Sequence, residues 1–151
     1  ITAVLVTLAL PSLGAQVSRQ RLKSAAEALG ADLAEARFDA ARRGSALHLH
    51  FSTGAEWCWA VATASGCDCR VAAQTCQLKT VRSNAHPGVL LTQARDAYFD
   101  PATGATTGAN ADRGSALLRS DRGDTLQVGL TRLGRVRVCA PDSAALGYPR
   151  C

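Results

Sequence analysis

Hydrophobic and polar positions divide the first 43 residues into two parts. Residues 1–13 carry no charge and are almost all apolar, and charged residues begin at Arg19. A helix needs about 20 apolar residues to cross a bilayer, so this segment is too short to do so alone. It also lacks the basic start and the small-residue cleavage site of a secretory signal peptide. We therefore expect the natural chain to start upstream of Ile1, with further apolar residues that extend this segment into one long helix.

An amphipathic helix pattern follows and continues to residue 43. Apolar residues recur at steps of three and four, which places them on one face of a helix. These residues are Leu22, Ala25, Ala26, Leu29, Leu33, Ala36 and Ala40. Arg42 and Arg43 occupy the expected last turn and precede Gly44, an order that is typical of a helix end.

Beyond residue 44 the apolar positions recur at every second residue. Within residues 46–51, apolar side chains alternate with two histidines, which predicts a half-buried strand. Further short strands are expected at residues 57–63, 77–81, 89–92, 115–119, 125–130 and 135–139. Hairpins are expected between the first two strands and between the last two. Residues 65–75 should form a cysteine-stapled loop and residues 98–114 a surface loop.

These elements predict an α+β fold, in which a long N-terminal helix packs on a head of short antiparallel strands in a two-sheet, β-sandwich-like arrangement. The helix covers residues 1–43, with an apolar part at about 1–15 and an amphipathic part at about 16–43, and the head covers residues 44–151. A chain of 151 residues is long enough for one such domain and too short for two.

The net charge of +5 is unevenly distributed along the chain. Residues 19–43 carry six bases and four acids, and residues 44–131 carry seven of each. Residues 132–151 carry four arginines and one aspartate. The excess of positive charge therefore lies on the helix and at the C-terminus. A clustered excess indicates a polyanionic partner more strongly than a spread one does.

The six cysteines indicate disulfides formed in an oxidising compartment. They are Cys58, Cys67, Cys69, Cys76, Cys139 and Cys151. Six cysteines allow 15 pairings, and we favour a bond between the last two, which closes a short C-terminal loop. The other four should pair among themselves in an order that the sequence leaves open, although Cys67 and Cys69 are too close to bond each other.

The C-terminal arginines form the main candidate binding site. Arg135 and Arg137 lie two positions apart on an expected strand, so they project from one face, while Val136 and Val138 face the interior. Gly134 would let the chain turn without a side chain that blocks an approaching phosphate.

Two more arginines should join this site, because Arg132 precedes the turn and a bond between Cys139 and Cys151 would fold Arg150 back. Four phosphate contacts would give sequence-independent binding, with log K falling by roughly 0.9 per contact for each decade of salt. From the residues alone, we prefer a simpler explanation to phosphate binding: the arginines form a solvated strand face or contact acids of a neighbouring subunit.

The order of these features resembles the GspH/FimT family of minor type IV pilins and pseudopilins over essentially the whole chain. The features, in chain order, are an apolar start with Pro11, a helix ending at Arg42-Arg43-Gly44, a second strand with tryptophan, the Phe99-Asp100-Pro101 loop with Gly104, and Gly134-Arg135-Val136-Arg137-Val138-Cys139. The resemblance implies a leader and a Phe-Thr-Leu-Ile-Glu-like start, with a methylated Phe, upstream of Ile1.

The resemblance also implies a place in the cell and a function. The helix would anchor the subunit in the inner membrane, with the head in the periplasm, and would later pack against other pilins in a cell-surface type IV pilus. The Gly-Arg-x-Arg sequence favours the FimT-like branch, in which this motif is associated with DNA binding in natural transformation. A structural or priming minor pilin, or a GspH-like type II secretion pseudopilin, is the main alternative, and an adhesion subunit that uses its loops is a third.

Other candidate sites have simpler explanations. His48 and His50 could ligate a metal, but two surface histidines on a strand are preferred, and no metal is expected. Trp57 and Trp59 could stack on bases, but a place in the alanine-rich core is preferred for at least one of them. Tyr148 could stack on bases or pack inside. The sequence has no G-x-S-x-G elbow, phosphate loop or H-E-x-x-H helix, so we expect neither catalysis nor a cofactor.

Overall fold

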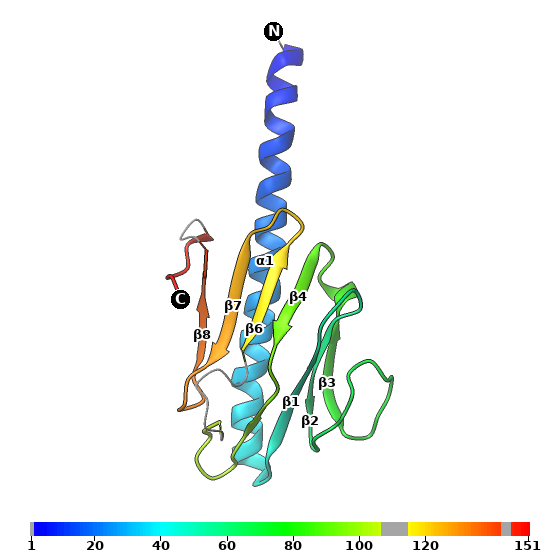
Figure 1. Cartoon of the computed structure of the whole chain (residues 1–151), viewed down its shortest axis with the longest axis vertical. Coiled ribbons are helices and arrows are strands. Elements are labelled where there is room, and N and C mark those ends of the chain that lie inside the picture. Colours follow the sequence, from blue (N-terminus) through cyan, green and yellow to red (C-terminus); the bar gives the residue numbers. More distant parts are fainter. Residues whose placement is uncertain (1, 107–114, 143–145) are drawn as a thin grey trace.

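The computed structural model describes residues 2–106, 115–142 and 146–151, with side chains from residue 12 onward. The described chain folds into one long helix followed by short strands (Figure 1). The elements are α1 (Thr2–Arg43), β1 (Leu47–Ser52), β2 (Cys58–Ala62), β3 (Gln77–Arg82), β4 (Val89–Ala94), β5 (Ala97–Phe99), β6 (Ala116–Ser120), β7 (Thr125–Leu130) and β8 (Val136–Cys139). The surface loop expected up to residue 114 is described only as far as Thr106.

Helix α1 continues through Pro11, and its N-terminal part projects beyond the strands (Figure 1). The seven residues of the predicted apolar face are all buried, with at most 3% of any side chain exposed. The helix ends at the predicted place, where Gly44 takes a φ of +62° and the Ser45 N–H donates to the Ala40 carbonyl over 3.3 Å. No helix in the described part of the chain has the length and hydropathy that a membrane crossing requires.

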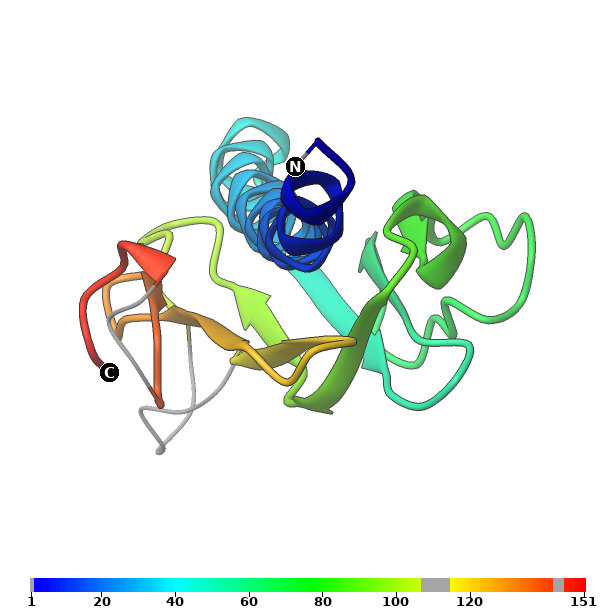
Figure 2. The same cartoon turned by 90° about the horizontal axis from the view of Figure 1, so that it is seen from above.

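The strands form two antiparallel sheets of four. The first has the order β3-β2-β1-β5 and the second β4-β6-β7-β8, and both predicted hairpins, β1–β2 and β7–β8, are present. Figure 2 shows the two sheets next to each other on one side of α1, so that the helix covers them and they do not cover one another. Strand β5 was not predicted from the sequence; it pairs with β1 and buries Phe99 completely.

Two tryptophans fill the space that the small side chains of the helix leave. Trp57 and Trp59 are fully buried and stack with their ring centres 5.4 Å apart. The indole N–H of Trp57 donates to the Val89 carbonyl over 2.8 Å, which ties β4 of the second sheet to the start of β2. The preferred interpretation of these side chains as core residues is therefore confirmed.

Asp32 is the polar counterpart of this apolar contact. Its side chain is 5% exposed, and its two carboxylate oxygens accept from the Trp59 indole over 2.8 Å and from the Lys79 ammonium over 2.5 Å. The hydrogen bond to Asp32 is also the main cause of a raised pKa at Lys79. Because Asp32 lies on α1 while its partners lie on β2 and β3, the group fixes the rotation of the helix over the first sheet.

The turn between β6 and β7 fixes the second sheet to the helix. Asp121 accepts a short hydrogen bond from the Ser18 hydroxyl, and Asp124 pairs with the Arg19 guanidinium at 3.2 Å. The turn at residues 121–124 therefore also attaches the sheet to the helix, at the point where α1 leaves the head.

Removing the Asp32 carboxylate should destabilise the fold. In Asp32→Ala the buried Trp59 indole loses its acceptor, so we expect the free energy of unfolding to fall by about 2 kcal/mol in a urea titration. Asp39→Ala is the matched control, because Asp39 pairs with the exposed Arg42 on the same helix and should cost less than about 0.5 kcal/mol. Equal losses in the two variants would contradict this role for Asp32.

The stacking of His86 on the tryptophans predicts a pH dependence. Its ring lies 5.9 Å from that of Trp59, and burial lowers the pKa of His86 below its ordinary value while the charge of Asp32 opposes the shift. The folded state therefore binds the proton more weakly than the unfolded chain, and stability falls as the pH drops through about 6.5. We expect Tm to decrease from pH 7.5 to pH 5, and less so in His86→Phe. If Tm falls with pH as steeply in His86→Phe as in the wild type, His86 is not the cause of the pH dependence.

Candidate nucleic-acid interface

The β7–β8 hairpin places Arg135 and Arg137 on one face. Arg137 pairs with Gly129 across the two strands, and the Thr131 N–H donates to the Arg135 carbonyl over 2.9 Å. Both arginines are exposed, whereas Val136 and Val138 pack against the core. The alternation expected from the sequence is therefore present, and it turns both guanidinium groups away from α1.

The end of this hairpin carries the third arginine. Arg132 and Leu133 are exposed in the turn, and 64% of Leu133 is accessible to solvent. The Arg135 N–H donates to the Thr131 hydroxyl over 3.1 Å, which closes the turn around them. Arg132 is thus three residues from Arg135 and lies at the end of the hairpin, beyond the paired strands.

The C-terminal segment brings the fourth arginine to β8. Cys139 is bonded to Cys151, the pairing that the sequence favours, and Ala140 forms a β-bridge with Arg150. The Arg137 guanidinium donates to the Arg150 carbonyl at 3.5 Å, a long and weak hydrogen bond. The Arg150 side chain is exposed. The four exposed arginines are named the arginine cluster below: Arg132, Arg135, Arg137 and Arg150.

The cluster has no acidic partner among the described residues. In the described part of the chain, the ion pairs are formed by other basic residues, namely Arg19, Arg42, His50, Arg70 and Lys79. Asp142 is the acid of the same segment, and its carboxylate accepts from the Thr125 hydroxyl over 2.5 Å. The positive charge of the cluster is therefore available to a ligand.

Gly134 has a different role from the one expected. It is buried with a φ of +72°, and a Cβ on it would lie 2.1 Å from the Gly104 carbonyl oxygen and 3.4 Å from Cδ of Arg37. Gly134 thus packs against the 100–106 loop and the helix, which leaves no room for a phosphate. This glycine contact between Gly104 and Gly134 was missed because the sequence shows both glycines but not that they meet.

The other disulfides lie at the opposite edge of the molecule. Cys58 is bonded to Cys69, and Cys67 to Cys76, so the four pair among themselves and the neighbours Cys67 and Cys69 do not bond each other. The loop between β2 and β3 that they hold covers the face of β2 turned away from the helix, where Cys58, Ala60 and Cys69 are buried together. Figure 1 shows this loop beside β3, far from β8.

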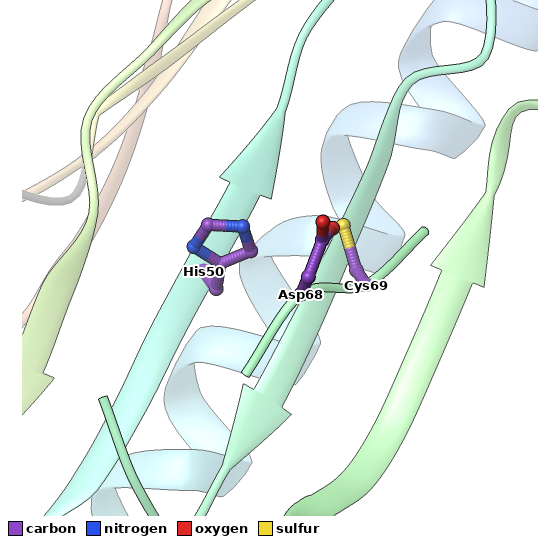
Figure 3. A group of neighbouring side chains, drawn as sticks. All are labelled: His50, Asp68 and Cys69. Carbon is purple, nitrogen blue, oxygen red and sulfur yellow. The ribbon is translucent and has the colours of Figure 1, made fainter. Parts of the chain in front are cut away.

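Three potential metal ligands converge near this loop, but their chemistry does not suit a metal site. The ligand atoms of His50, Asp68 and Cys69 lie within 4.8 Å of one another (Figure 3). The sulfur of Cys69 is in a disulfide and cannot act as a thiolate ligand. Hydrogen bonds from Arg70 hold the Asp68 carboxylate and lower its pKa to about 2.

The two histidines of β1 have partners of their own. His50 contacts the Asp96 carboxylate through Nδ1 at 2.8 Å, and His48 stacks on Tyr98 with 5.7 Å between ring centres. The structure therefore gives each histidine a local packing or hydrogen-bonding role.

Tyr148 packs inside the protein, which is one of the two roles considered for it from the sequence. Its hydroxyl donates to the Glu27 carboxylate over 2.9 Å, its ring packs against the core, and Lys23 lies 5.9 Å from the ring centre. Burial raises the pKa of Tyr148, and the hydrogen bond to Glu27 adds to the shift. With Trp57 and Trp59 fully buried, the aromatic side chains considered for base stacking are all engaged in packing.

Comparison with known proteins supports the fold. No protein-family model matches the sequence, and no curated protein matches it. The structure is similar to the crystal structure of the type IV minor pilin FimU from Pseudomonas aeruginosa strain PAO1, at 18% identity and a TM-score of 0.57, over 81% of this chain and 98% of FimU. The chain therefore has a minor pilin fold, while the GspH/FimT branch stays a prediction.

The glycine contact should be sensitive to a single methyl group. In Gly134→Ala a Cβ must displace the Gly104 backbone at a left-handed φ, so we expect a loss of at least about 2 kcal/mol in chemical unfolding. Gly129→Ala is the control, because its Cβ would meet nothing closer than 3.8 Å, and it should change stability by less than about 1 kcal/mol. If Gly134→Ala is as stable as Gly129→Ala, the contact between Gly104 and Gly134 does not contribute to the stability of the fold.

Proposed function

We propose that this protein is a minor type IV pilin of the FimT-like branch that binds extracellular DNA for uptake in natural transformation. The observation that carries the proposal is the arginine cluster, in which four exposed guanidinium groups lack an acidic partner among the described residues. The four lie along β8, from the hairpin turn at Arg132 to the segment at Arg150 that the Cys139–Cys151 disulfide holds beside the strand's other end.

The chemistry of the cluster fits the DNA backbone. Arginine binds phosphate through two parallel N–H groups, whereas lysine provides only a point charge. Contacts with phosphates fix the position of a protein on DNA but carry no sequence information. A cluster of this kind therefore predicts binding that is independent of sequence and sensitive to salt, which suits the capture of any DNA.

Helix α1 accounts for the pilin part of the proposal. Apolar side chains remain exposed on the helix outside its buried face, among them Leu13 at 54%, Val17 at 49% and Phe38 at 69%. We infer that these side chains pack against other pilin subunits in the fibre, and that the apolar start of the chain holds the subunit in the inner membrane before assembly. The minor pilin fold shared with FimU supports this role.

A purely structural role is the second candidate. Leu133 is exposed between Arg132 and Gly134, and an apolar side chain beside arginines also fits a contact with an acidic neighbouring subunit. In that case the protein would be a priming minor pilin or a GspH-like pseudopilin of type II secretion, and loss of the arginines would disturb assembly instead of DNA capture.

A mobility-shift titration with duplex DNA at several salt concentrations tests the proposal. We expect salt-dependent binding by the wild-type chain. In Arg135→Gln/Arg137→Gln the slope of log K against log salt should fall by about 1.8, because each lost phosphate contact removes about 0.9.

The matched control removes two arginines elsewhere. Arg42→Gln/Arg43→Gln changes the charge equally at the end of α1 and should keep most of the affinity. Absence of binding at low salt, together with defective pili in cells that carry the Arg135/Arg137 variant, would support the structural role instead.

A further inference from the structure

A row of residues crosses the face of the second sheet that is turned away from α1. The Arg95 N–H donates to the Ser115 carbonyl over 2.9 Å, and Gly129 pairs with Arg137. Ser115, which directly precedes β6, is a neighbour of Gly129 on β7, since a Cβ on Gly129 would lie 3.8 Å from that of Ser115. Arg95, Ser115, Gly129 and Arg137 therefore form one row, called the Arg95–Arg137 row below, with an arginine at each end.

Two adjoining hollows follow this row. One has a volume of about 240 Å³ and is lined by Gly129 and Arg137 among others, and the other has about 110 Å³ and is lined by Arg95. Ser115 and Gln127 line both hollows, so together these form a shallow trough from one arginine to the other. Arg95 is exposed, and it forms no ion pair within the described part of the chain.

The length of the row suits a stretch of DNA backbone. Neighbouring strands lie about 4.8 Å apart, so three steps from β4 to β8 place the backbones of Arg95 and Arg137 roughly 14 Å apart. One strand of a duplex carries one phosphate for each base pair, so a row of this length can follow a short stretch of one strand's backbone. The small residues in its centre, Ser115 and Gly129, allow the DNA backbone to approach the sheet closely.

The residues of the trough favour a duplex over a single strand. Single-strand sites stack bases on exposed aromatic rings. The described residues that line the two hollows include no aromatic side chain, and the nearby Tyr148 is held by Glu27 on the helix side.

We propose that DNA binds along the Arg95–Arg137 row on the outer face of the second sheet, with Arg95 as a contact at the far end from the arginine cluster, and that the ligand is a duplex held by its phosphates. This inference rests on the proposed function, because it extends the same site.

The test uses the full chain in a nonionic detergent and a fluorescent duplex in an anisotropy titration. Arg95→Gln should weaken binding about five- to tenfold at 0.1 M salt and lower the salt slope by about 0.9. Gly129→Glu places a negative charge in the centre of the row, where the backbone leaves room for a side chain, and should weaken binding further. A single strand of the same length should bind no more tightly than the duplex.

Arg70→Gln is the charge-matched control, because Arg70 lies on the disulfide loop at the opposite edge, and its affinity should stay within about twofold of wild type. Thermal unfolding of each variant shows that it is folded.

Wild-type affinity in both Arg95→Gln and Gly129→Glu would overturn this inference and leave the proposed function intact if Arg135→Gln/Arg137→Gln still loses binding. An equal loss in Arg70→Gln, or tighter binding of the single strand, would also overturn it. Absence of binding by the wild-type chain would overturn both proposals.

Discussion

The apolar stripe of α1 is the constraint on which the head depends. Both sheets use this stripe as their inner cover, and its alanines let the strands approach closely while Trp57 and Trp59 fill the remaining space. A smooth apolar contact of this kind allows sliding and rotation, so directional contacts are needed to fix its register. Asp32 provides one of them on the first sheet, and the turn at Asp121 provides another on the second.

Much of this fold can be predicted from the sequence, since periodicity reports directly on burial. The helix face, the helix end at Gly44 and both hairpins follow from local patterns that the packing leaves unchanged. Strand β5 has only three residues, which is too short for a period to show. It exists because Phe99 has a place in the core beside β1.

The candidate site also has some features that can be predicted from the sequence and others that cannot. The common face of Arg135 and Arg137 is a local property of a strand and was predicted. The function of Gly134 and the position of Arg95 depend on which distant segments become neighbours, and the sequence does not show those pairings. Gly104 and Gly134 both belong to the motifs of the sequence, but only the fold shows that the two backbones meet.

Ser18 and Arg19 bond the β6–β7 turn of the second sheet to α1, and near the other end of the sheet the Arg37 side chain lies beside the glycine contact. A molecule attached to the outer face of this sheet would therefore transmit mechanical load to the helix through these bonds at one end and through side-chain packing at the other. Strands β6, β7 and β8 would share that load through their ladder of hydrogen bonds, so tension need not concentrate on one loop. Load on the outer face would thus be spread over the second sheet before it reached the helix.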